Sequence, residues 1–135
     1  MTVHTDLCCR IQTIHPGQPS ETACTVLVID DEAPIVSLLG DVLRPVGYNV
    51  IQAVGAEQAL RAIEGAEIHL VIAELNLIGI QAIRRAVRAP FLWLSEYADG
   101  ESCAANVLGK PFQIAELHRK VAQALTARSS GPNVD

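Results

Sequence analysis

Five side chains suited to a metal or phosphoryl site stand at the ends of apolar stretches of the sequence. Two adjacent carboxylates, Asp30 and Asp31, follow the run TVLVI, and a third, Glu74, follows HLVIA. Ser95 ends the run PFLWLS, and Lys110 comes directly after NVLG. Carboxylate oxygens are ligands for Mg²⁺, a lysine can neutralise a phosphoryl oxygen, and a serine hydroxyl can hydrogen-bond another. Each residue alone has an ordinary explanation, but the repeated placement predicts a shared site.

The apolar stretches that precede these residues are typical of buried parallel strands. Residues 25–29 are β-branched or aliphatic without alternation, as expected for a strand that is covered on both faces. The same reasoning predicts further strands at residues 48–53, 69–74, 90–95 and 106–109. In an open α/β sheet, ligands bind just outside the carboxyl ends of the strands, where the five side chains would meet. The competing interpretation is that Asp30 or Asp31 only caps the following helix.

Helical spacing separates the expected strands. Pro34 suits a first helical turn, and apolar residues recur until Pro45 and Gly47 end the pattern. The recurring residues, which we expect on the buried face, are Ile35, Leu38, Leu39, Val42 and Leu43. Further helices are expected over residues 56–64 and 79–88, and from Ile114 to Leu125. Regular alternation of strands and helices predicts a parallel sheet with helices on both faces.

Length and composition restrict the class of protein. The chain has 135 residues, of which 50% are hydrophobic and 19% charged, as in one globular domain. A net charge of −5 without a basic run argues against direct binding to nucleic acid or to a membrane surface. The first residues, MTVHTDLCCR, lack the apolar core of a secretion signal, so we expect a cytoplasmic protein.

The ends of the chain show no recurring apolar pattern. We expect residues 1–23 to be a disordered leader, residues 24–127 the folded domain, and residues 128–135 a flexible tail. The leader contains Cys8 and Cys9, which could bind a metal or respond to redox conditions. Adjacent cysteines lack the usual gap between zinc ligands, so we favour no special role for them.

Several motifs together resemble the receiver domain of two-component response regulators. They are TVLVIDDE, GYNVIQA, LVIAE, FLWLS and GKPF, and they extend the resemblance over about residues 24–127. The resemblance implies a CheY-like, flavodoxin-like fold: a doubly wound, five-stranded parallel sheet in three α/β/α layers. It also implies a signalling module without enzymatic activity of its own. In this family an aspartate that ends the third strand accepts a phosphoryl group from a histidine kinase.

The resemblance assigns a role to each candidate residue. Asp30 and Asp31 match the Mg²⁺-binding acids, which would act together with the residue at the phosphoacceptor position, Glu74. Ser95 matches the switch hydroxyl and Lys110 the phosphoryl-sensing lysine. The residue after Lys110, Pro111, would then follow a cis peptide bond.

The sequence departs from the family at functional positions. Glu74 replaces the phosphoacceptor aspartate, and its extra methylene moves the carboxylate by roughly 1.5 Å, about one carbon–carbon bond. Displacement on that scale disturbs the in-line geometry of phosphoryl transfer. The stretch from Ser95 to Lys110 is about two helical turns shorter than in the family, so we expect a shortened or missing fourth helix. Val107 stands where the family has a switching aromatic residue.

Three hypotheses follow from these observations. The leading one is an atypical single-domain receiver that acts by protein–protein interaction with a histidine kinase or other signalling protein and with a downstream effector. In it, Glu74 and Lys110 pair as a built-in mimic of the phosphorylated state. The alternative is a genuine Mg²⁺-dependent receiver that accepts phosphate at Glu74 or Asp30. A remote alternative is a small flavodoxin-like enzyme or nucleotide binder, although the sequence contains no glycine-rich phosphate loop.

Overall fold

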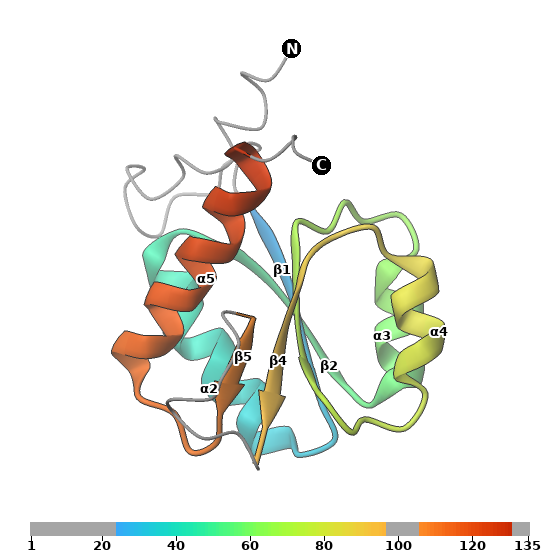
Figure 1. Cartoon of the computed structure of the whole chain (residues 1–135). Coiled ribbons are helices and arrows are strands. Elements are labelled where there is room, and N and C mark those ends of the chain that lie inside the picture. Colours follow the sequence, from blue (N-terminus) through green and yellow to red (C-terminus); the bar gives the residue numbers. More distant parts are fainter. Residues whose placement is uncertain (1–23, 97–105, 131–135) are drawn as a thin grey trace.

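The computed structural model describes residues 24–96 and 106–130 of the chain (Figure 1). Five parallel strands form one sheet in the order β2-β1-β3-β4-β5. The strands are β1 (Thr25–Asp30), β2 (Asn49–Val54), β3 (Leu70–Glu74), β4 (Phe91–Ser95) and β5 (Val107–Gly109). This order is that of flavodoxin-like, doubly wound sheets, and it confirms the expected fold class.

Helices cover both faces of the sheet. Figure 1 shows α2 and α5 on one side and α3 and α4 on the other. Their bounds are α2 (Ala33–Leu43), α3 (Ala56–Ile63), α4 (Ile80–Ala86) and α5 (Ile114–Ser130), with a short 3₁₀ helix, η2 (Arg44–Val46), after α2. Because α5 continues through Ser130, the first residues of the expected tail are helical. Three expectations concern residues outside the described part of the chain. They are the leader with its cysteines, the rest of the tail, and the shortened or missing helix between β4 and β5.

The two faces of the sheet carry separate cores, which explains why β1 lacks alternation in its sequence. Successive side chains of a strand point to opposite faces. Val26 and Val28 therefore pack with residues of α2 and α5, whereas Leu27 and Ile29 pack with residues of α3 and α4. All four side chains are fully buried. A strand covered on both sides has no place for a polar side chain until it ends at Asp30.

Strand β4 places two aromatic residues on the α3 and α4 side. Phe91 and Trp93 are alternate residues of β4, and their rings stack with centroids 4.8 Å apart. The guanidinium of Arg84, from α4, lies 5.6 Å from the centroid of the Trp93 ring.

Within the described ranges, no helix combines the length and apolar character that crossing a membrane requires.

Candidate functional site

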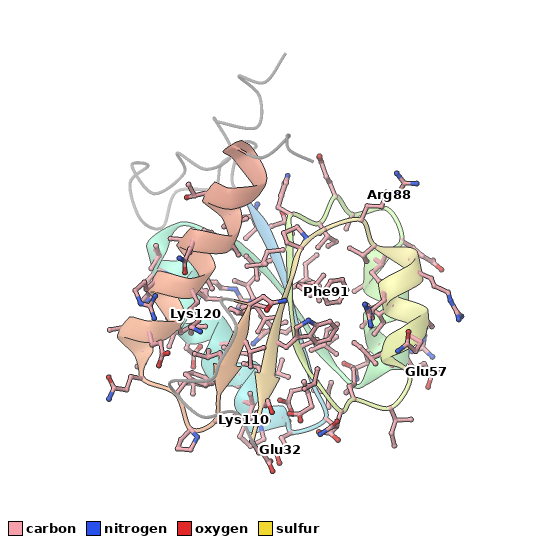
Figure 2. All side chains as sticks on the ribbon, viewed as in Figure 1. Glu32, Glu57, Arg88, Phe91, Lys110 and Lys120 are labelled. Carbon is pink, nitrogen blue, oxygen red and sulfur yellow. The ribbon has the colours of Figure 1, made fainter. Side chains whose placement is uncertain are left out.

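The register of the sheet brings the predicted site residues to one edge. Asp30 is the last residue of β1 and Glu74 the last of β3, and these strands are direct neighbours. Glu74 pairs with Leu94, and Ser95 pairs with Gly109, the residue before Lys110. The carboxyl ends of β1, β3, β4 and β5 are therefore nearly level. Figure 2 shows Lys110 and Glu32 close to this end of the sheet.

Lys110 forms ion pairs with two of the predicted acids. Its Nζ atom lies 2.6 Å from Oε1 of Glu74 and 2.9 Å from Oδ2 of Asp30. The side chains are largely shielded from solvent, with exposed fractions of 9% for Lys110, 12% for Glu74 and 0% for Asp30. Buried charges are tolerated when they are paired and hydrogen-bonded, and each charge in this cluster has such a partner.

The second carboxylate oxygen of Asp30 orders the turn that leads into α2. Oδ1 accepts a hydrogen bond from the backbone N–H of Glu32 at 2.9 Å. An aspartate that binds the backbone two residues further on makes a local turn, which starts the chain in its new direction. Glu32 itself is the N-cap residue of α2 and makes no side-chain capping bond. Asp30 is thus bonded through both oxygens, and its role is not that of a helix cap.

The two carboxylates stabilise the charged form of Lys110. Burial lowers the pKa of its ammonium group, but hydrogen bonds to Glu74 and Asp30 and the charges of these acids outweigh burial. The result is a pKa above the ordinary lysine value of 10.5. Lys110 is therefore a fixed cation at neutral pH.

The remaining predicted residues lie near the ion pairs in different ways. Ser95 is buried, and its backbone carbonyl accepts a hydrogen bond from the backbone N–H of Lys110 at 2.9 Å. The peptide bond between Lys110 and Pro111 is cis, as expected. Asp31, in contrast, is exposed to solvent. The structure therefore joins Asp30, Glu74 and Lys110 into one cluster and leaves Asp31 outside it.

The arrangement does not preform the expected Mg²⁺ site of Asp30, Asp31 and Glu74, which stays a prediction. Among the described residues, no group of three or more histidine, cysteine, aspartate or glutamate side chains is arranged to hold a metal ion. The oxygens of Asp30 are already bonded to Lys110 and to the backbone of Glu32. The ammonium group of Lys110 provides the positive charge between Asp30 and Glu74.

A hollow beside Lys110 was not anticipated from the sequence. It has a volume of about 450 Å³, lies between α2 and the turn that joins β5 to α5, and is lined by Ile35, Leu38, Glu96, Lys110, Pro111 and Phe112. Helical spacing had placed Leu38 on the buried face of α2, but its exposed fraction is 40%. Spacing defines the direction of an apolar face, but it does not show how far the neighbouring elements extend over that face.

Known proteins resemble this chain in sequence. No family model matches the chain. The DNA-binding response regulator MtrA of Mycobacterium tuberculosis is 31% identical over 79% of this chain and 53% of its own length. The transcriptional regulatory protein YvrH of Bacillus subtilis is 26% identical over 72% of this chain and 47% of its own length. The chain thus spans about half the length of these curated relatives.

Solved structures agree on the fold. The chemotaxis response regulator CheY4 of Vibrio cholerae superposes with a TM-score of 0.64 at 23% identity, over 75% of this chain and 98% of its own. A two-component response regulator from Clostridium difficile gives a TM-score of 0.65 at 21% identity, over 80% of this chain and 99% of its own. The fold is therefore CheY-like. Together with the sequence relatives, this fold identifies the chain as a receiver domain of two-component response regulators.

Proposed function

We propose that this receiver domain signals by protein–protein contact, in a state fixed by the ion pair between Glu74 and Lys110 instead of by a phosphoryl group. The observation that carries the proposal is the 2.6 Å contact between Oε1 of Glu74 and Nζ of Lys110. Lys110 matches the family's phosphoryl-sensing lysine, and here it already binds an anionic oxygen from the chain itself. A permanent carboxylate partner would remove the need for phosphorylation.

The geometry makes both candidate acceptors poor nucleophiles. A carboxylate that attacks phosphorus must present a free oxygen in line with the leaving group. Oε1 of Glu74 is bound to an ammonium group, so at most Oε2 could attack, and the side chain is only 12% exposed. Asp30 is fully buried and is bonded through both oxygens. The alternative of a phosphoacceptor at Glu74 or Asp30 is therefore the less favoured one.

The partners belong to the same proposal. The relatives are named as transcriptional regulators or as a DNA-binding response regulator, and this chain covers about half of their length. We propose that the domain works in the cytoplasm, receives its input from a histidine kinase or another signalling protein, and passes it to an effector protein without binding nucleic acid itself. A chain with a net charge of −5 suits contacts with proteins better than contacts with a polyanion.

Intact-mass measurement tests the proposal. Wild type, Glu74→Asp and Glu74→Gln are incubated with acetyl phosphate and Mg²⁺, and the intact mass of each protein is measured before and after incubation. We expect no phosphoryl adduct on the wild type, and an adduct on Glu74→Asp because the shorter side chain withdraws from Lys110. An adduct on the wild type that is absent from Glu74→Gln would overturn the proposal. If Glu74→Asp also stays unmodified, the altered loops around the site are the additional obstacle.

A further inference from the structure

The segment from residue 75 to residue 95, which contains α4 and β4, is basic in an otherwise acidic chain. It includes Arg84, Arg85 and Arg88 and no aspartate or glutamate, whereas the whole chain has a net charge of −5. All three arginines are exposed, and within the described ranges none of them forms an ion pair. Cations at the end of a helix are favourable in themselves, so the arginines alone do not mark a site.

Two aromatic side chains beside the arginines provide a second, independent observation. Phe91 and Trp93 stack on the α3 and α4 side of β4, and both are only partly buried. The guanidinium of Arg84 lies over the Trp93 ring, 5.6 Å from its centroid, which is within the range of a cation–π contact. Figure 2 shows Phe91 beside β4, on the side of the strand that faces α4. Tryptophan and arginine are enriched at the centres of protein interfaces, and here they occur together on a surface.

A hollow at the ends of α3 and α4 adjoins the third arginine. It has a volume of about 270 Å³, and its lining includes Ile63, Ile68, Val87 and Arg88. Pockets for drug-sized molecules measure roughly 300–1,000 Å³, so this hollow suits one apolar side chain of a partner better. Glu67 also lines it, and a carboxylate there disfavours an acidic group inside the hollow.

The three arginines and the two aromatic residues form what we call the arginine–aromatic surface: Arg84, Arg85, Arg88, Phe91 and Trp93. We infer that this surface binds an acidic segment of a partner protein. Carboxylates of the segment pair with the guanidinium groups, because the planar N–H donors of arginine match the two oxygens of a carboxylate. One apolar side chain of the segment enters the hollow beside Arg88.

Charge around the surface favours a protein over nucleic acid as the occupant. Glu64 and Glu67, at the end of α3 and after it, would repel a continuous polyanion, whereas a protein segment can place its acidic residues on the arginine side alone. The arginine–aromatic surface contains neither Glu74 nor Lys110. The inference therefore goes beyond the proposed function and does not depend on it.

Fluorescence titration with a designed peptide tests the inference. Trp93 is the only tryptophan of the chain, so its emission reports binding at this surface. The probe is a short peptide of glutamate, serine and glycine with one central leucine and no aromatic residue. The matched control peptide has lysine in place of every glutamate. With the full chain, we expect the acidic peptide to change the Trp93 emission in a saturable, salt-sensitive way, and the basic peptide to leave it unchanged.

Variants of the chain and of the peptide locate the contacts. Arg84→Gln and Arg88→Gln should each weaken binding of the acidic peptide about threefold, because each removes one cation from the surface. Arg119→Gln removes the same charge from α5, on the other side of the sheet, and should leave the affinity unchanged. Alanine in place of the leucine of the peptide should weaken binding about tenfold, because the hollow then stays unfilled. Circular dichroism confirms that each variant is folded.

Several results would overturn the inference. An acidic peptide that leaves the Trp93 emission unchanged is one, and unchanged affinity in both Arg84→Gln and Arg88→Gln is another. A DNA duplex that changes the emission at a lower concentration than the acidic peptide would make the surface a nucleic-acid site instead. A wild-type dimer in sedimentation that Arg84→Gln dissociates would show that the occupant is a second copy of the chain.

Discussion

The Nζ atom of Lys110 lies 2.6 Å from Oε1 of Glu74, and the same ammonium group reaches Oδ2 of Asp30 at 2.9 Å. The three residues come from the carboxyl ends of β5, β3 and β1. One lysine therefore links residues that are 36 and 80 positions away from it in the sequence. Two carboxylates that would otherwise repel each other are held together by this cation, and the receiver's site is occupied by its own side chains.

Removal of Lys110 should destabilise the domain strongly. In Lys110→Met, the carboxylates of Asp30 and Glu74 lose their cation while they remain buried, which costs about 3 kcal/mol in the free energy of unfolding. Arg61→Met is the matched control, because it breaks an exposed ion pair with Glu57 and should cost at most about 0.5 kcal/mol. Urea unfolding measures both values. Equal stability of Lys110→Met and wild type would show that the ion pairs do not hold the strand ends together.

Alkaline pH should weaken the same interaction. Lys110 has a pKa raised above 10.5, so its contribution to stability is fully present below pH 10.5, where both folded and unfolded chains are protonated. Above that pH the unfolded chain loses its proton first, and the contribution falls as the pH approaches the folded-state pKa. The stability advantage of wild type over Lys110→Met should therefore be constant from about pH 8 to about pH 10 and shrink beyond it. An advantage that grows above pH 10.5 would contradict the assignment.

Gly40, in α2, leaves room for a side chain of β2. A Cβ atom at this position would lie 2.6 Å from Nε2 of Gln52, which donates a hydrogen bond to the carbonyl of Val36 at 2.9 Å. Gly40→Ala gains about 1 kcal/mol of helix propensity but loses a hydrogen bond of similar value, so it should be nearly neutral. In a Gln52→Ala background the same change should stabilise by about 1 kcal/mol. A double-mutant cycle measures this coupling, and equal effects in both backgrounds would exclude it.

Gly79, which precedes α4, holds the loop after Glu74 in a conformation that other residues disfavour. Its φ is +88°, and a Cβ atom there would lie 2.9 Å from the Cβ of Ala56. Gly65 has a φ of +76° with no atom near its missing Cβ. Gly65→Ala should therefore cost about 1 kcal/mol from backbone strain alone, and Gly79→Ala should cost more because it adds a steric clash. Thermal unfolding compares the two, and an equal cost would show that the loop yields freely.

Much of the fold could be predicted from the sequence, because buried parallel strands have a plain signature. Unbroken apolar runs located the strands, and their polar final residues located the edge that carries Asp30, Glu74 and Lys110. The pairing of Glu74 with Lys110 followed from the resemblance to receivers. The participation of Asp30 in the same ion pair, and the exposure of Asp31, could not be predicted, because both depend on how far the chain turns at the end of β1.

The hollow beside Lys110 could not be predicted from the sequence for a different reason. Leu38 follows the spacing of the buried residues of α2, yet its surroundings depend on where the turn at Pro111 and Phe112 ends. The position of that turn is set by packing between α2 and the segment that leads into α5, and Leu38 and Pro111 are more than 70 positions apart in the sequence. A local pattern contains no information about contacts of that range.

The amide ¹H–¹⁵N spectrum of the wild-type chain, recorded with Mg²⁺ present before and after addition of acetyl phosphate, tests most directly whether the site is fixed by its own ion pair. The account predicts that the signals of Glu74, Ser95, Lys110 and Phe112 keep their positions in the wild type, and that they shift in Glu74→Asp. A shift of these signals in the wild type would contradict it, because it would show that the site still responds to phosphate.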